Sequence, residues 1–98
     1  MEKRVPHCKL SRVKELVEAG KMRTTHSARV GATALGLSYT EMIAVVLALK
    51  SADFFKSMTT YADHTIWQDV YRPKTVAGDV YLKLTVIDDV LIVSFKEL

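Results

Sequence analysis

The sequence predicts an α+β fold, in which helices from the first half of the chain cover one face of an antiparallel sheet from the second half. Two observations carry this prediction. Residues 10–50 place apolar side chains at helical spacing, whereas residues 54–97 alternate apolar and polar side chains as strands do. Because 98 residues leave room for only one core, residues 1–98 are expected to form a single domain.

The first predicted helix begins with Ser11 as its N-cap and ends at Gly20. Serine accepts a hydrogen bond from an unpaired backbone N–H of the first turn, and glycine suits the residue after a helix. Helical spacing puts three apolar side chains on one side, which should face the core: Val13, Leu16 and Val17.

Two more helices should follow. Residues 21–25 are expected to be a connector, and residues 27–35 a second helix that Gly36 ends. Ser38 and Glu41 have the spacing of a capping box, which marks the start of a third helix. That helix continues through the nearly all-apolar run 42–49, so it is expected to be buried, under the sheet.

Four strands are predicted in the second half, over residues 55–61, 66–72, 80–86 and 90–96. The last two are expected to form a hairpin with Asp88-Asp89 as a two-residue loop. In that register three apolar pairs form the core face: Leu82–Phe95, Leu84–Val93 and Val86–Leu91.

On the opposite face of this hairpin, Tyr81 faces Lys96 and Lys83 faces Ser94. Directly opposed side chains have Cβ atoms about 5 Å apart. A phenol and an ammonium therefore lie together on the face that the helices leave open. On RNA, lysine binds phosphate, and tyrosine donates a hydrogen bond, stacks on a base or exchanges a proton.

The register of the two earlier strands stays open. A two-residue loop at Asp63-His64 pairs Thr59 with Gln68 and turns Lys56 to the other side. A three-residue loop instead gathers three side chains on one face: Lys56, Gln68 and Arg72.

Composition and spacing exclude several classes of protein. Residues 1–50 carry nine Lys or Arg and four Glu, whereas residues 51–98 carry five Lys or Arg and seven Asp or Glu, so the first half is basic and suits an acidic partner. A single cysteine, Cys8, forms no internal disulfide. His7, His26 and His64 show no metal-ligand spacing, and no cofactor motif is present. We therefore expect neither metal nor cofactor. Without a signal peptide or membrane span, a cytoplasmic location is expected.

Three blocks of the sequence resemble the MqsR family of bacterial toxins. They are Met1–His7, Lys56–Pro73 and Asp79–Glu97, and the likeness extends over essentially the whole chain, most strongly in residues 54–97. The resemblance implies a RelE-like ribonuclease fold and a type II toxin that cuts messenger RNA at GC-containing, GCU-like sites without the ribosome. It also implies an MqsA-like antitoxin partner, which binds zinc and has a helix-turn-helix DNA-binding domain.

The residues implicated in the activity of the family correspond here to Lys56, Gln68, Tyr81 and Lys96. Their carry-over requires that Lys56 and Gln68 share a face with Tyr81 and Lys96, which a loop of odd length or a bulge would achieve. The hypothesis is metal-independent attack of the ribose 2′-OH on phosphate, with Lys56 or Tyr81 handling protons.

In the same hypothesis Gln68 orients a base or the ribose, and the expected RNA-binding residues are Lys83 and Arg72, with Lys96 also holding the phosphate. The alternative function is a module without catalysis, which binds RNA or regulates the DNA binding of its antitoxin.

Overall fold

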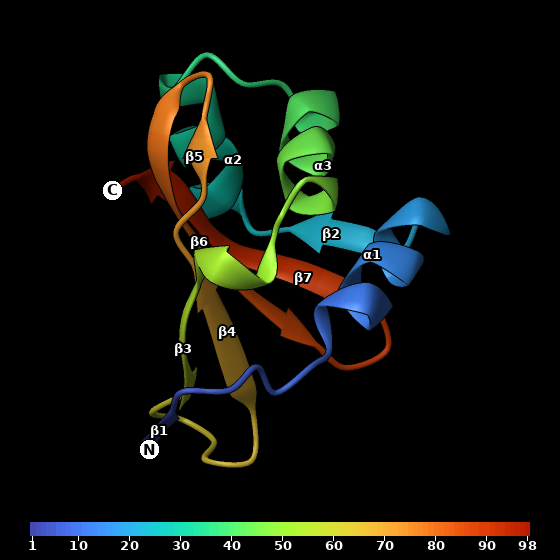
Figure 1. The fold of residues 1–98 in the computed structure, drawn as a ribbon, viewed down its shortest axis with the longest axis vertical. Coiled ribbons are helices and arrows are strands. Elements are labelled where there is room, and N and C mark those ends of the chain that lie inside the picture. Colours follow the sequence, from blue (N-terminus) through green and yellow to red (C-terminus); the bar gives the residue numbers. More distant parts are fainter.

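A computed structural model describes all residues, 1–98, as three helices and a sheet (Figure 1). The elements follow in the order β1 (Glu2–Lys3), α1 (Leu10–Glu18), β2 (Met22–Thr24), α2 (His26–Ala34), α3 (Tyr39–Leu47), a 3-10 turn (Ser51–Asp53), β3 (Phe54–Thr59), β4 (Trp67–Tyr71), β5 (Lys74–Thr75), β6 (Gly78–Val86) and β7 (Val90–Glu97).

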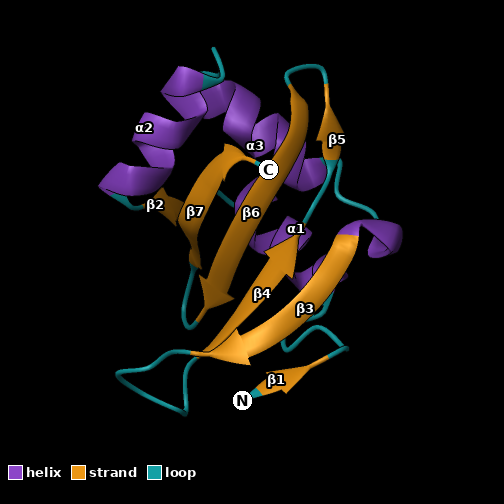
Figure 2. Cartoon of the chain, turned by 90° about the vertical axis from the view of Figure 1, so that its left-hand side faces the viewer, coloured by secondary structure: helices purple, strands orange, loops and turns teal.

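The sheet has the strand order β1-β3-β4-β6-β7-β2, and β5 pairs with β6 beside it. All pairings are antiparallel except that of β2 with β7, which is parallel. Figure 2 shows β3, β4 and β6 in front with α1 and α3 behind them, and α2 beside β7. The predicted α+β fold, with helices from the first half on one face of a sheet mainly from the second, is confirmed.

Helix α1 begins two residues earlier than predicted. Its N-cap is Lys9, which makes no side-chain capping bond, so the prediction of Ser11 as N-cap is wrong. Leu10 packs against the core, and starting the helix there brings this apolar side chain inward while Ser11 stays exposed. Gly20 follows the helix with φ +78°, and the three predicted apolar residues are buried: Val13, Leu16 and Val17.

The predicted connector 21–25 contains strand β2, which the sequence pattern did not indicate. Three residues are too short for an alternation to be visible, and the strand is defined by its pairing with β7, Met22 with Val90 through Thr24 with Ile92. Two side-chain contacts hold it: Arg23 pairs with Asp89, and the Tyr39 hydroxyl donates to the Met22 carbonyl at 2.8 Å.

Helix α2 agrees with its prediction to within one residue. Thr25 caps it, accepting a hydrogen bond from the Ala28 N–H at 3.1 Å and donating to the Val93 carbonyl of β7 at 2.8 Å. Gly31 faces β7 so closely that a Cβ there would lie 1.9 Å from the Phe95 carbonyl oxygen. A glycine is therefore needed for α2 to pack on the sheet.

Helix α3 has the predicted capping box, with Ser38 and Glu41 each bonded to the other's backbone N–H. Its burial was predicted only in part. Met42, Val46 and the following Leu49 are buried, but Ala44 and Ala48 are exposed, because no element covers that side of the helix.

The β6–β7 hairpin corrects the predicted register. Val86 pairs with Val90, so Ile87, Asp88 and Asp89 form the loop, and the expected pairs Leu84–Val93 and Val86–Leu91 do not form. An extra residue, Val93, then bulges out of β7 and restores the predicted pairing from Lys83–Ser94 onward. The longer loop shifts the pairing by one residue and the bulge shifts it back, so Tyr81 pairs with Lys96 as predicted.

One apolar cluster joins the helices to the core face of the sheet, where Leu82, Leu84, Ile92 and Phe95 are at most 1% exposed. None of the three helices is by itself long and apolar enough to span a membrane. Helices α2 and α3 reach the length and composition only as a pair, which is bent by 93°.

Candidate active site

The strand registers place Lys56 and Lys83 in one row across the sheet. Lys56 pairs with Val70, Val70 with Lys83, and Lys83 with Ser94, so the row crosses β3, β4, β6 and β7. Cross-strand partners point to the same side of a sheet. Since Leu82 and Leu84 face the core, this row points away from it, onto the side that we call the open face.

Tyr81, Gln68 and Arg72 lie on the open face above or below this row. Tyr81 is two residues from Lys83 and pairs with Lys96, whose ammonium lies 5.4 Å from the centre of the phenol ring. Gln68 and Arg72 are two residues from Val70 on either side, and Gln68 pairs with Met58. The structure thus brings all six predicted residues to one face: Lys56, Gln68, Arg72, Tyr81, Lys83 and Lys96.

The β3–β4 register differs from both registers that the sequence left open. Met58 faces Gln68, and Lys56 faces Val70, since residues 60–66 form a longer loop than either count assumed. The loop is held by hydrogen bonds among Thr60, Asp63, Thr65 and Ile66. Its odd length keeps Lys56 and Gln68 on one face, as the family resemblance required, and this expectation is confirmed.

Lys56 is engaged by a residue that the sequence analysis did not single out. Strand β1 pairs with β3 and sets Glu2 opposite Met58, where its carboxylate forms an ion pair with Lys56 at 2.5 Å. The lysine side chain is 23% exposed, and the ion pair lowers the pKa of Glu2. An anion that binds Lys56 would have to compete with Glu2. No pattern in the sequence predicted this contact, because β1 is two residues long.

Lys83 is the lysine with the most unusual surroundings on the open face. It is half-buried, and this burial, together with the positive charge of Lys96 nearby, lowers its pKa from the usual value of 10.5. Loss of hydration and a neighbouring like charge both favour the neutral amine. A larger fraction of Lys83 than of an ordinary lysine is therefore the neutral amine at a given pH, and this is the form that accepts a proton.

Of the three histidines only His64 borders the open face, where it lines a small hollow with Glu2 and Met58. His7, His26 and His64 are all exposed; His7 stacks on Trp67 with ring centres 5.5 Å apart and meets Lys3 at 2.9 Å. No three His, Cys, Asp or Glu side chains come together as metal ligands. The titratable side chains that the strand registers gather on this face are mainly lysines and Tyr81, with Glu2 paired to Lys56.

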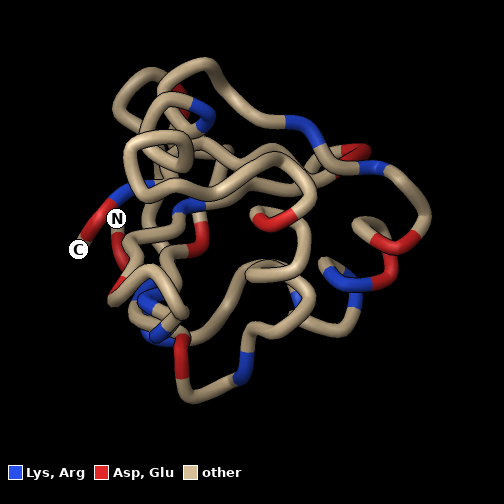
Figure 3. Tube along the Cα trace, turned by 90° about the horizontal axis from the view of Figure 1, so that it is seen from above, with Lys and Arg blue, Asp and Glu red and all other residues tan.

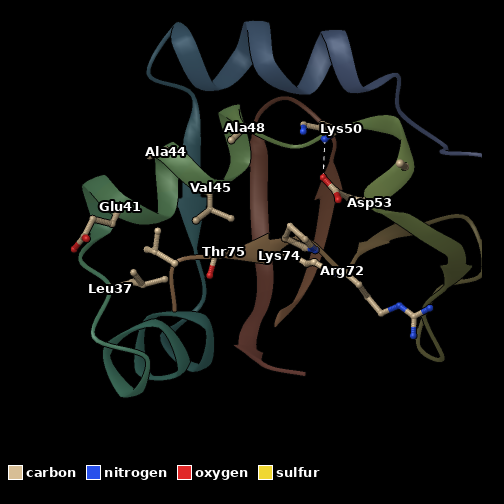
Figure 4. A pocket seen from close by; sticks show the side chains of 13 residues that line it. Leu37, Glu41, Ala44, Val45, Ala48, Lys50, Asp53, Arg72, Lys74 and Thr75 are labelled. Carbon is tan, nitrogen blue, oxygen red and sulfur yellow. Dashed lines mark hydrogen bonds between the residues drawn. The ribbon is translucent and has the colours of Figure 1, made fainter. Parts of the chain in front are cut away.

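The largest hollow of the molecule lies elsewhere. A groove of 940 Å³ separates α3 from the β5 region, with Ala44, Val45 and Ala48 on its helix side (Figure 4). Lys50 and Lys74 line it too, and Asp53 accepts a hydrogen bond from the Lys50 N–H at 2.8 Å. Of the six open-face residues only Arg72 borders this groove, and its guanidinium extends away from the other labelled side chains in Figure 4.

Fold and site together define a small α+β protein whose sheet offers a cationic, tyrosine-containing face to solvent. Basic and acidic residues otherwise occur all around the molecule (Figure 3), so this face is distinguished by the grouping of its side chains and not by overall charge.

Comparison with known proteins agrees with this description and makes it specific. Residues 5–97 match the family described as "Motility quorum-sensing regulator, toxin of MqsA", and the chain belongs to this MqsR toxin family. It is 65% identical over 97 residues to the protein named "mRNA interferase toxin MqsR" of Escherichia coli (strain K12), covering 99% of both chains.

Proposed function

We propose that the chain is an endoribonuclease that cleaves messenger RNA on the open face and acts as the toxin of a type II toxin–antitoxin system. The observation that carries this proposal is the convergence of Lys83, Tyr81 and Lys96 on one side of the sheet, where Lys96 is exposed and the other two are half-buried. The relative's name, which describes an mRNA interferase toxin, supports the choice of substrate.

In the reaction proposed, the ribose 2′-oxygen attacks the adjacent phosphorus and the bond from phosphorus to the 5′-oxygen breaks. The 2′-OH proton passes to the neutral Nζ of Lys83, and the Tyr81 hydroxyl gives its proton to the leaving 5′-oxygen. Lys96 and Lys56 stabilise the charge that develops on the phosphoryl oxygens. The products are a 2′,3′-cyclic phosphate and a 5′-hydroxyl, and no step uses a metal ion.

Lys83 replaces Lys56 as the base in this proposal for two reasons. Lys56 is paired with Glu2, whereas Lys83 makes no ion pair and has a lowered pKa. Lys83 also lies between Val70 and Ser94 in the middle of the row, next to both Tyr81 and Lys96. Gln68, two residues from Val70 along β4, is placed to orient the ribose or a base from the side.

The finer features of the proposal rest on membership of the family. They are cleavage at GC-containing, GCU-like sites without the ribosome, a location in the cytoplasm, and an MqsA-like antitoxin with a zinc-binding part and a helix-turn-helix part. Through such an antitoxin the complex would bind operator DNA. The family description, which calls its members toxins of MqsA, supports the choice of partner.

The test is cleavage of a defined GCU-containing RNA by the purified protein, with and without EDTA, followed by mapping of both new ends. We expect cyclic phosphate and 5′-hydroxyl ends in both samples, and no cleavage of the DNA of the same sequence. Tyr81→Phe and Lys96→Ala should each lower kcat about 100-fold or more without changing the melting temperature much.

The control for these variants is Arg29→Gln, because Arg29 also lies against a tyrosine, 4.9 Å from the ring of Tyr39, but on helix α2. It should cleave at the wild-type rate. RNA that is retained but left intact by the wild-type protein would instead support the module without catalysis, and wild-type rates in both Tyr81→Phe and Lys96→Ala would refute the site.

A further inference from the structure

A bulge in β3 places one aromatic ring among three cations at the edge of the open face. Phe54 pairs with Tyr71 and Lys56 with Val70, so Phe55 is the extra residue of β3 between them. The Arg72 guanidinium carbon lies 3.7 Å from the centre of the Phe55 ring, the Lys56 ammonium 5.4 Å and the Arg4 guanidinium carbon 5.6 Å. Bulges commonly re-aim a side chain in this way.

The two arginines of this cluster have no anionic partner in the folded chain. The ion pairs of the molecule involve Arg12, Arg23 and Lys56, and neither Arg4 nor Arg72 makes a side-chain hydrogen bond. The acidic side chains nearby are engaged elsewhere: Glu2 pairs with Lys56, and Asp69 accepts hydrogen bonds from the His7 and Cys8 backbone N–H groups. Asp53 contacts Arg72 through its backbone carbonyl and uses its carboxylate on the Lys50 N–H. Both guanidinium groups, each with five donors, are exposed to solvent.

Lys56 is paired with Glu2, whose carboxylate also interacts electrostatically with Arg4, so the ring keeps a net positive surround of about two charges. The ring offsets their repulsion only in part, since a cation–π contact at an exposed site contributes about 0.5–1 kcal/mol. An arrangement of this kind is stabilised when an anion binds between the cations. The ring also restrains the Arg72 side chain, so that less freedom is lost when the guanidinium binds a phosphate.

We propose that Arg4, Phe55 and Arg72 form a subsite for a phosphodiester of the RNA backbone that flanks the scissile phosphate. Arg4 and Arg72 donate to the phosphate oxygens, and Phe55 is a positioning residue that holds Arg72. This inference rests on the proposed function for the identity of the polyanion as RNA.

The position of the subsite supports a flanking phosphate and not the scissile one. Strand β3 lies two strands from β6, which carries Tyr81 and Lys83, and neighbouring strands are about 4.8 Å apart. The subsite is therefore about 10 Å from the proposed proton-transfer residues. Lys56, which belongs both to the row with Lys83 and to the Phe55 cluster, connects the two.

The test compares two RNAs: a minimal one with little beyond the cleavage site, and one extended by several nucleotides on both sides. An uncleavable 2′-O-methyl form of the extended RNA is used for binding. Arg4→Gln should weaken binding of that RNA about tenfold, the loss expected for a charge-assisted phosphate contact. It should also reduce the slope of log K against log salt by about 0.7.

In cleavage, Arg4→Gln and Phe55→Leu should both lose several-fold more kcat/KM on the extended RNA than on the minimal one. Arg29→Gln is the matched control, since it removes one arginine from an aromatic ring on the helical side, and it should behave as wild type. Melting curves establish whether Phe55→Leu is folded. If it is unfolded, the result of Arg4→Gln alone tests the subsite, because Arg4 is exposed and its substitution should leave the fold intact.

Equal weakening by Arg4→Gln and Arg29→Gln would overturn the proposal, because the effect would then be one of total charge. Equal losses on the two RNAs would overturn it too, as would an Arg4→Gln protein that binds RNA normally and loses only its antitoxin. Wild-type protein that binds the uncleavable RNA through Arg4 but cleaves nothing would refute the proposed function and leave the subsite standing.

Discussion

At the scale of single residues, Lys83 combines a proposed role as the base with an unfavourable contribution to folding stability. Its ammonium is half-buried and lies near that of Lys96, and both effects lower its pKa in the folded state. A group that loses its proton more readily when folded destabilises the fold wherever the unfolded chain still holds that proton. Below the lowered pKa the full penalty applies, and above the unfolded pKa, about 10.4, it vanishes.

Lys83→Met should therefore melt at a higher temperature than wild type at neutral pH, and the difference should shrink as the pH rises toward about 10.4. The same substitution should lower kcat about 100-fold or more if Lys83 is the base. The rising limb of the wild-type pH–rate profile should lie below the usual lysine range. Lys96→Gln, with one positive charge fewer beside Lys83, should shift that limb of its remaining activity to higher pH.

The measurements are melting curves and single-turnover rates across the pH range. Lys83→Met with wild-type rates at every pH would assign the proton transfer to another group, and a melting temperature below that of wild type at pH 7 would show that Lys83 stabilises the fold.

At the scale of elements, the sequence indicated the four main strands and the core side of α1 by periodicity, and α2 and α3 with the help of Gly36 and the capping box. Those segments bury apolar side chains at a spacing set by the backbone, which a sequence shows directly. Strand β2 was missed because its three residues are strands only by pairing with β7. The bulges at Phe55 and Val93 were missed as well, since backbone geometry and neighbours such as Thr25, which bonds the Val93 carbonyl, determine them.

The same distinction applies to the candidate site. The pairing of Tyr81 with Lys96 was predicted from the hairpin. It is correct only because the bulge at Val93 reverses the one-residue shift that the longer loop introduces. Whether Lys56 and Gln68 share that face was open, because it depends on the parity of a loop whose ends the sequence does not mark. The contacts of Glu2 and Phe55 were not predicted, since each requires a strand pairing or bulge visible only in three dimensions.

Helix capping gives a direct test of one correct and one wrong prediction at this scale. Ser38→Ala removes an observed N-cap of α3, which typically costs about 1 kcal/mol, or a fall of roughly 4–8 °C in melting temperature for a domain of this size. Ser11→Ala should change the melting temperature little, because Ser11 lies inside α1 and caps nothing. Equal losses in both variants would mean that α1 begins at Ser11 after all.

At the scale of the whole molecule, the two faces of the sheet lie in different environments, one in the core and one toward solvent. Its core face meets the helices with fully buried side chains, while its open face carries Lys56, Lys83 and Lys96 around Val70, with Tyr81 and Gln68 nearby. Adjacent residues of β6 therefore belong to different parts of the protein: Leu84 is 0% exposed in the core, and Lys83 lies on the proposed RNA side. Introducing aspartate at each of these two positions in turn distinguishes an effect on folding from an effect on RNA binding.

Leu84→Asp should leave the protein unfolded, because a carboxylate without a partner enters the core opposite Ile92 and an apolar side chain is lost. The expected loss is on the order of 4 kcal/mol or more, a large part of the stability of a small domain. Lys83→Asp places the same carboxylate on the open face, beside Lys96, so the protein should stay folded. It should bind uncleavable RNA more weakly, with a flatter dependence on salt. Thermal melting and RNA titration measure the two effects separately. If both variants lost the same melting temperature, or if Lys83→Asp bound RNA as wild type does, the open face would not be the RNA-binding side of the sheet.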